Sequence, residues 1–524
     1  MKSFIRIVAL LLALLMVSSF FVACNSNPGG NDDDTEDTQA SVENNDNQNT
    51  ESEEDDKGTE AGEQTTGAED SDVTDETPSE SKLQGNFGGA EYRILGYYND
   101  DRAFWDFEVD YEKIPEDVVG KAVWDRNVAI EEKYGLEVVG TLTTSPVHTE
   151  ASVFIGAGDD QYDLIICQNN TMLSFAVAGE FVNINTMPHI NLEMDCWNQS
   201  VNDQFTYGNK MYYTANKFLL QEKHRTWMIW YNRDLATELN VGHLEDEVFN
   251  NTWTMDRVIE IARTHAANVD GQDGMAFADR WGFVGADPYV FGQLAYGAGF
   301  RLSNKDSDGY PQLIGATEEM NIILDKIFEL SSNRNISFFS EYRPISSENA
   351  MDYGEGIFRE GRAVLMGEAV SYLEHVNELD FKYGVLPNPK YNEAQASYIS
   401  MPNLGNGHLF AVPVTVGDIE MAGFGLQAIS EESVATTYNA YIEERCKKQD
   451  AEDLDMAKCL EIIFDGVAYD VALIDDIGGL GSVMHKDLLV SGTNTFSRLY
   501  KSKERRAKTQ IKNIKEAYEK HEDA

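Results

Sequence analysis

The spacing of apolar residues between positions 91 and 180 predicts alternating strands and helices. Residues 91–98 (EYRILGYY) and 136–142 have strand patterns, and the continuous apolar run at residues 164–167 is typical of a strand buried on both faces of a parallel sheet. Helices are predicted at about residues 115–134 and 171–180. The order strand-helix-strand-helix-strand indicates a doubly wound α/β sheet.

The first predicted helix carries start and stop signals of its own. Pro115, Glu116 and Asp117 stand in its first turn, and Gly135 stands where a C-cap glycine belongs. Its apolar face repeats at Val119, Val123, Ile130 and Tyr134.

Ligands of doubly wound sheets bind outside the carboxyl ends of the strands. The rule predicts two groups of binding residues, after the first strand and after the third: Tyr98, Asn99 and Asp100, and Gln168, Asn169 and Asn170. Trp105 lies in an aromatic cluster (FWDF) on a predicted loop, where exposed rings favour binding over packing.

The first 24 residues have the pattern of a signal peptide. Lys2 and Arg6 flank an apolar run at residues 7–17 that is too short for a stable membrane span. Ala23-Cys24 resembles the lipobox of bacterial lipoproteins, although Phe21 stands where Leu is usual. The resemblance implies that Cys24 is lipidated and anchors the protein to the extracellular face of the cell membrane.

Residues 25–82 contain almost only polar and acidic residues. With 20 acidic residues and 2 lysines, this stretch carries a net charge of −18 and is predicted to be a disordered tether. The rest of the chain, residues 83–524, still carries −33. So acidic a domain repels phosphate-rich partners, which argues against nucleic acid binding.

About 440 residues follow the tether, more than one ordinary core holds and enough for two lobes. The cysteines at 167, 196, 446 and 459 show no zinc-site spacing, so no metal site is predicted. The sequence leaves open whether Cys446 and Cys459 form a disulfide bond.

Several segments, in order, resemble the extracellular solute-binding proteins that include the maltose-binding protein. The first matching segment, YDLIICQNNTMLSFAVAGEFVNI at residues 162–184, contains the predicted third strand. The next two, GNKMYYTANKF at 208–218 and WYNRDLA at 230–236, resemble the two strands that cross between the lobes in that family. Three more follow: TWTMDRVIEIA at residues 252–262, IFREGRAVLMGEAVSYLEH at 357–375 and FKYGVLPNPKY at 381–391.

The resemblance implies a periplasmic-binding-protein type II fold, with two discontinuous α/β lobes, a hinge and an interlobe cleft. Lobe 1 is expected at about residues 88–218 and 355–412, lobe 2 at about 219–354 and 413–500, and a C-terminal helix at 501–524. The implied protein is a monomer without cofactors or catalysis. It binds a solute, most simply an oligosaccharide, and delivers it to the membrane permease of an ABC transporter.

The resemblance also names cleft residues. It implies that Tyr289 stacks on a sugar ring and that Asp287 accepts hydroxyl hydrogen bonds, a pairing that suits carbohydrate. Where the maltose-binding protein has Gly-Pro-Trp, this chain has Gly367-Glu368-Ala369, so one stacking platform is missing. Glu368 adds a carboxylate there, and Tyr372 is expected to replace the platform in part.

Two alternative functions stay open at this point. Carboxylates beside a sugar cleft also serve glycoside hydrolases, although no hydrolase motif is present. A ligand-binding subunit of a sensor, without import, would have the same cleft. A peptide, a polyol or a uronic-acid oligomer also stays open as the ligand, although Asp100, Asp287 and Glu368 would oppose an anionic ligand unless Arg102 or Arg225 neutralises them.

Two further patterns are structural. Residues 304–309 begin like a calcium loop but have Gly315 where the bidentate glutamate belongs, so Asp308-Gly309 is predicted to be a hairpin turn. Residues 501–520 place Ile511, Ile514 and Tyr518 on one face of a helix that packs against a lobe.

Overall fold

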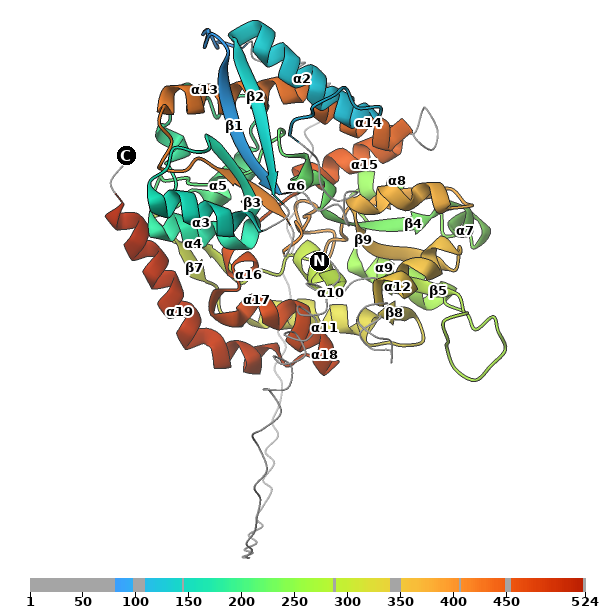
Figure 1. Ribbon diagram of the computed structural model, residues 1–524. Coiled ribbons are helices and arrows are strands. Elements are labelled where there is room, and N and C mark those ends of the chain that lie inside the picture. The colour runs from blue at the N-terminus through green and yellow to red at the C-terminus, as the bar shows by residue number, and fades with distance from the viewer. Residues whose placement is uncertain are drawn as a thin grey trace, which may run out of the picture. The chain divides into compact units, whose positions relative to one another are not determined.

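The computed structural model describes residues 81–97, 109–143, 146–285, 289–339, 350–404, 407–447 and 454–521 (Figure 1). They belong to one compact unit, Asp75–Ala524. The predicted signal peptide, Cys24 and most of the tether lie outside the described residues. So do the candidate site residues Tyr98, Asn99, Asp100, Trp105 and Asp287.

The first sheet has the strand order β11-β3-β1-β2. Strand β1 (Ala90–Tyr97) pairs in parallel with β2 (Leu136–Thr143) and with β3 (Leu164–Gln168). Strand β11 (His408–Ala411) comes from far along the chain and pairs antiparallel with β3. We call this sheet and the helices packed on it the first lobe.

The second sheet has the strand order β10-β4-β9-β5-β8. Its strands are β4 (Trp227–Asn232), β5 (Trp281–Gly285), β8 (Ser337–Phe339), β9 (Ala363–Ala369) and β10 (Tyr383–Leu386). Strands β8, β5 and β9 are parallel to one another, whereas β4 runs antiparallel to both β9 and β10. This sheet and its helices form the second lobe, from which a two-stranded hairpin of β6 (Ser303–Lys305) and β7 (Pro311–Leu313) projects.

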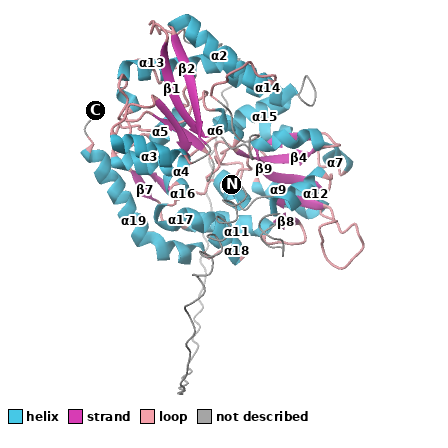
Figure 2. Ribbon diagram, viewed as in Figure 1, coloured by secondary structure: helices cyan, strands magenta, loops and turns pink. Residues whose placement is uncertain are grey.

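Helices surround both sheets in the ribbon views (Figures 1 and 2). In the first half of the chain the α-helices are α2 (Val118–Tyr134), α3 (Val147–Ala157), α4 (Asn169–Ala178), α5 (Gln199–Phe205), α6 (Leu220–His224), α7 (Arg233–Glu238), α8 (Leu244–Phe249) and α9 (Met255–His265). They continue as α10 (Tyr289–Gly297), α11 (Glu318–Ser331), α12 (Ala350–Arg359), α13 (Ile419–Ser433), α14 (Asn439–Lys447), α15 (Leu454–Asp465), α16 (Val471–Ile474), α17 (Leu480–Ser482), α18 (Leu488–Ser491) and α19 (Phe496–Lys520).

Most local predictions for the first lobe are confirmed, but α2 begins later than predicted, because Pro115, Glu116 and Asp117 precede its first turn instead of forming it. Helix α2 begins at Val118 because the Asp117 carboxylate accepts the Gly120 N–H, and it ends at Gly135, whose φ of 57° is left-handed. The three strands lie within a residue of their predicted bounds. The predicted order required a helix between the second and third strands but gave no range for it, and α3 occupies that place. The hairpin turn is confirmed, with Gly309 at φ 80°.

The predicted lobe boundaries differ from the observed sheets. Residues 355–412 were assigned to the first lobe, but β9 and β10 hydrogen-bond to β4 in the second sheet. Conversely, α13 follows residue 413 yet packs against α2 in the first lobe. Both differences arise because sheet membership depends on pairing between distant segments rather than on local pattern.

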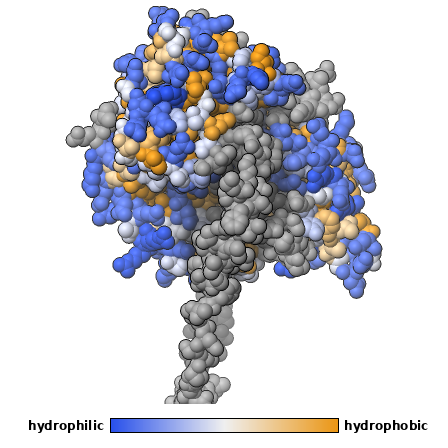
Figure 3. All heavy atoms as spheres, viewed as in Figure 1, coloured by the Kyte–Doolittle hydropathy of each residue, from blue (hydrophilic) through white to orange (hydrophobic). Residues whose placement is uncertain are grey.

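Polar residues dominate the visible surface, with apolar side chains scattered among them (Figure 3). The core contains large aromatic residues of the second sheet, including Trp227, Trp230 and Trp281, all buried. Within the described ranges, no helix combines the length and the apolar character that a membrane span requires.

Candidate ligand-binding site

Two of the chain segments that pass between the lobes are hydrogen-bonded to each other. One leads through α6 into β4, and the other leads from β10 back to β11. The Trp227 N–H donates to the Met401 carbonyl at 3.0 Å, and the Asn403 N–H donates to the Arg225 carbonyl at 3.0 Å. Paired crossing segments of this kind form the natural hinge of a two-lobed protein.

The polar residues after β3 lie beside the returning segment. Asn169 is buried, and its side-chain amide donates to the Asn403 carbonyl at 2.8 Å. Its Oδ1 atom is also buried but accepts no hydrogen bond from the described residues. Gln168 is half-buried and Asn170 is exposed. The first lobe therefore presents an unused amide acceptor beside the hinge.

In the second lobe, the carboxyl ends of β5 and β9 share an edge with the start of β4, because β4 is antiparallel to β9. Tyr289 opens α10 four residues beyond the described end of β5 and is half-buried. Its ring lies 6.2 Å from the Trp227 ring, between centroids, at an interplanar angle of 38°. The two rings make an aromatic corner at this edge of the second sheet, which we call the candidate edge.

Glu368 and Tyr372 lie across the sheet from that corner. The register pairs Glu368 with Met228, whereas Trp227 pairs with Ala369, and adjacent strand residues point to opposite faces. Gly367 faces α10, since a Cβ there would lie 2.5 Å from Val290. The Glu368 carboxylate is nearly buried and accepts the Ala369 N–H at 2.8 Å.

Tyr372 occupies a packed position. Its ring lies 5.1 Å from that of Trp230 and 6.2 Å from that of Phe358, and only 2% of the residue is exposed. Burial raises the pKa of its hydroxyl well above the ordinary value. The structure thus brings Tyr289 to the candidate edge but does not bring Tyr372 and Glu368 to the same face.

Trp227 is a candidate that the sequence pattern did not single out as a ligand-binding residue. It is buried, yet its indole N–H has no acceptor among the described residues. A buried donor without a partner costs free energy, so its retention beside Tyr289 points to a role. Trp227 could be identified only from the strand pairing, because the antiparallel pairing of β4 with β9 brings the first residue of β4 to this edge.

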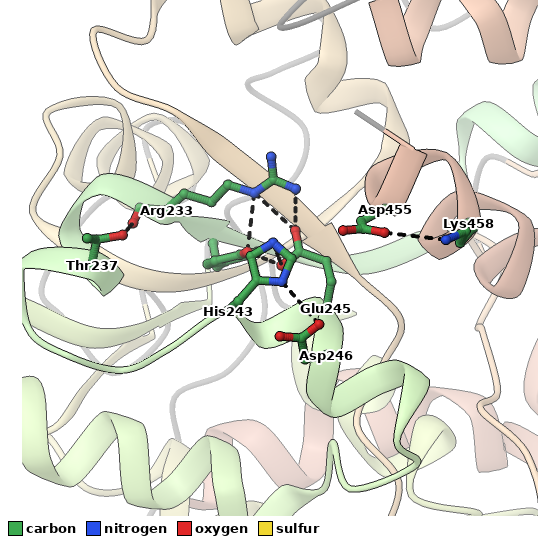
Figure 4. Close-up of polar contacts among 8 residues, drawn as sticks. Arg233, Thr237, His243, Glu245, Asp246, Asp455 and Lys458 are labelled. Atoms are coloured by element: carbon green, nitrogen blue, oxygen red, sulfur yellow. Dashed lines mark hydrogen bonds and ion pairs between the residues drawn. The ribbon is translucent and has the colours of Figure 1, made fainter. Parts of the chain in front are cut away.

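A second polar cluster lies at the opposite end of β4 and gives the WYNRDLA motif a structural meaning (Figure 4). The Tyr231 hydroxyl and the Arg233 guanidinium both donate to the fully buried Glu245 carboxylate, with Arg233 Nε 3.0 Å from Oε1. Asn232 caps α7 by accepting the Leu235 N–H at 2.8 Å. Strand geometry separates Tyr231 from Trp227 by about 13 Å.

This cluster holds the lobe together rather than facing a ligand. Burial, followed by the negative charge of Glu245, raises the pKa of Tyr231 above its ordinary value. Every oxygen of Glu245 is engaged, including a contact of 3.4 Å between Oε2 and His243 Nε2. Among the described residues, no group of three or more His, Cys, Asp and Glu could hold a metal ion.

Comparison with known proteins identifies the fold. No protein-family model matches the sequence, and no curated protein matches it. Solved structures do resemble it. A cyclo/maltodextrin-binding protein complexed with maltotetraose is 13% identical, with a TM-score of 0.52 over 81% of this chain and 98% of that one.

Two more structures give the same result. The cyclic α-maltosyl-1,6-maltose binding protein from Arthrobacter globiformis is 12% identical, with a TM-score of 0.52 over 81% of this chain and 100% of that one. The maltose-binding periplasmic protein MalE from Listeria monocytogenes, in complex with maltose, is 14% identical, with a TM-score of 0.50 over 83% and 99%. The predicted two-lobed α/β fold of the solute-binding proteins is thereby confirmed.

Proposed function

We propose that this chain is the substrate-binding component of an ABC importer and that it captures an oligosaccharide between its lobes without transforming it. One observation carries the proposal: the fold extends over practically the full length of carbohydrate-binding proteins of this architecture. Those neighbours are binding proteins rather than enzymes.

The candidate edge offers the chemistry that such a ligand requires. A sugar ring presents C–H groups to an aromatic face, and its hydroxyls both donate and accept hydrogen bonds. Tyr289 supplies the aromatic face, Trp227 a donor and Asn169 an acceptor. None of these three side chains is charged, which suits a neutral ligand.

The remaining predicted residues complete the proposal. Gln168 and Asn170 would add polar contacts, as would the predicted residues outside the described ranges, from Tyr98 to Asp100 and at Trp105 and Asp287. Cys24 would carry the lipid that keeps the domain at the extracellular face of the cell membrane, next to its permease. The charge of −33 on residues 83–524 supports the absence of nucleic acid partners.

The test is calorimetric titration of the purified chain with maltose, maltotetraose and a cyclic oligosaccharide, with a short peptide for comparison. Binding of one sugar, recovered intact afterwards, is the expected result. Tyr289→Ala should weaken that binding by about 1–3 kcal/mol, the free energy of covering a side chain of this size. Tyr353→Ala, an exposed tyrosine elsewhere in the second lobe, is the matched control and should bind as the wild type does.

Binding of the peptide alone would refute the carbohydrate assignment. Cleavage of the sugar would instead show a glycoside hydrolase.

A further inference from the structure

The last helix, α19, concentrates positive charge in a domain that is otherwise strongly acidic. Nine of its 25 residues are Lys or Arg and three are Glu, a net charge of +6, whereas residues 83–524 as a whole carry −33. The helix runs along the outside of the molecule (Figure 1). Cations gathered in this way on the surface of an acidic protein suit an anionic partner.

The cations of α19 are arranged on the side of the helix that faces solvent. The opposite side is buried in the domain through five residues, Phe496, Tyr500, Ala507, Ile514 and Tyr518. The solvent side carries five exposed cations, Arg498, Lys501, Arg505, Lys508 and Lys512. Their spacing alternates between three and four residues, which keeps side chains on one side of a helix. We call these five residues the cationic stripe, and they extend over about 21 Å of the helix.

The cationic stripe is not neutralised by the domain. Arg498, Lys501 and Arg505 form no ion pair with any of the described residues, and Lys508 and Lys512 each pair with a glutamate of α19 itself. Exposed ion pairs contribute little to stability, so those two lysines can exchange partners at small cost. The whole stripe is therefore available to an anionic surface outside the protein.

The chain just before α19 adds an apolar side chain to this surface. Val490 is 73% exposed and lies in α18, the short helix that leads into α19. Lys486 is exposed and lies in the helical segment Val483–Asp487, which packs against α19. Clustered cations with an exposed apolar residue are the combination by which peripheral proteins bind lipid, because cations contact the headgroups and the apolar group enters between them.

The negative charge of the domain orients such a contact rather than preventing it. At physiological ionic strength, charges are screened beyond about 8 Å, so an anionic surface responds mainly to the face of the protein that lies nearest to it. At longer range the remaining acidic faces are repelled, which favours approach with the cationic stripe foremost. Each Lys or Arg close to an anionic lipid surface then strengthens binding by about fivefold.

We propose that the cationic stripe and Val490 form a docking surface for an anionic phospholipid membrane. The membrane to which Cys24 would attach the chain is the nearest such surface, and attachment raises its effective concentration. The lipid would hold the chain at the membrane, and the stripe would fix which face of the domain lies on it. The affinity of the stripe for phospholipid depends neither on sugar binding nor on the lipid at Cys24.

The experiment is co-sedimentation of residues 25–524 with phospholipid vesicles. This chain lacks the predicted signal peptide and Cys24, so binding reports the surface of the protein itself. Vesicles of equal parts phosphatidylglycerol and phosphatidylcholine are compared with vesicles of phosphatidylcholine alone, at low and at high salt. The test variant combines three changes in the stripe, Arg498→Gln, Lys501→Gln and Arg505→Gln, and glutamine forms helices about as well as the residues it replaces.

A matched control removes the same amount of charge elsewhere. It combines Lys121→Gln, Arg263→Gln and Lys458→Gln, which replace exposed cations of α2, α9 and α15 that pair with acidic residues. Circular dichroism and thermal melting establish that both variants are folded. Titration with maltotetraose should give the same affinity for both variants as for the wild type, because the stripe lies outside the candidate edge.

The wild type and the control should bind the phosphatidylglycerol vesicles, more weakly as salt increases, and the stripe variant should bind about tenfold more weakly or less. Equal binding to both kinds of vesicle, no binding at low salt, or equal losses in the stripe variant and the control overturn the docking surface. Binding of soluble polyglutamate but not of vesicles also overturns it and assigns the stripe to an acidic protein segment. Failure to bind any sugar refutes the proposed function and leaves the vesicle result intact.

Discussion

Replacing Arg233 with methionine should destabilise the second lobe far more than removal of an ordinary surface charge. Glu245 is fully buried, whereas the Arg233 side chain is 19% exposed. The arginine donates through both Nε and Nη2, so its loss leaves the buried carboxylate with the Tyr231 hydroxyl and His243 as its side-chain partners among the described residues. Loss of one partner of a buried pair costs about 3–5 kcal/mol.

The reciprocal change, Glu245→Gln, should cost less, about 1–3 kcal/mol. The amide still accepts a hydrogen bond, and the partly exposed guanidinium regains water. Because the double variant removes both charges, its cost should fall well below the sum of the two single costs, which reveals their coupling.

Urea unfolding, followed by tryptophan fluorescence and circular dichroism, measures all three variants at one pH. Arg263→Met is the matched control, because Arg263 and Glu329 form an exposed pair with side chains 52% and 42% accessible. That pair should contribute about 0–1 kcal/mol. If Arg233→Met costs no more than Arg263→Met, the buried cluster does not hold the lobe and our interpretation of WYNRDLA is wrong.

Three smaller changes test other elements of the fold. Gly384→Ala should lower the melting temperature, because its Cβ would lie 2.2 Å from a ring atom of Tyr231. The Cβ of Gly156→Ala meets nothing within 4 Å, so this variant should be neutral or stabilising. Calorimetry measures both melting temperatures. Asp117→Ala removes the N-cap of α2 and should cost about 1 kcal/mol in urea unfolding, and an unchanged midpoint would show that the cap is dispensable. Burial opposes ionisation of Asp279, but three backbone N–H donors outweigh it and lower the pKa of that carboxyl. The stabilisation by ionised Asp279 is therefore present above the unfolded-state pKa of about 3.9 and is lost as pH falls below it. Asp279→Asn should therefore flatten the fall in the free energy of unfolding at acid pH. An unaltered slope would contradict the lowered pKa of Asp279.

Local signals in the sequence were sufficient to predict most strands and helices of the first lobe. Asp117 and Gly135 fix the ends of α2 through backbone bonds within a few residues, and the apolar run at residues 164–167 could be buried only as an inner strand. Asn169 follows that strand directly, as the sequence pattern indicated, and its role in ligand binding stays a prediction. Each of these features depends on neighbours in the sequence.

The features that the sequence did not predict depend on distant neighbours. The side chains of β9 suit either sheet, and only its pairing with β4 and β5 decides which. The same pairing sets the face of Glu368 and brings Trp227 to the candidate edge. Tyr372 has an aromatic ring of the kind that stacks on a sugar, but the rings of Trp230 and Phe358 pack against it and bury it.

The position of β11 in the first sheet has a consequence for how the chain acquires its structure. Cys167 of β3 pairs with Leu409, so the hydrogen-bonding edge of an apolar strand stays open until the second lobe has been synthesised. At the usual 5–20 residues per second this interval lasts on the order of tens of seconds. An open strand edge is a template for wrong pairing, so β3 is exposed to mispairing throughout this interval, and a chaperone that covers the edge should raise the yield of folded protein. Production should therefore respond more to chaperone supply than to the stability of the finished protein.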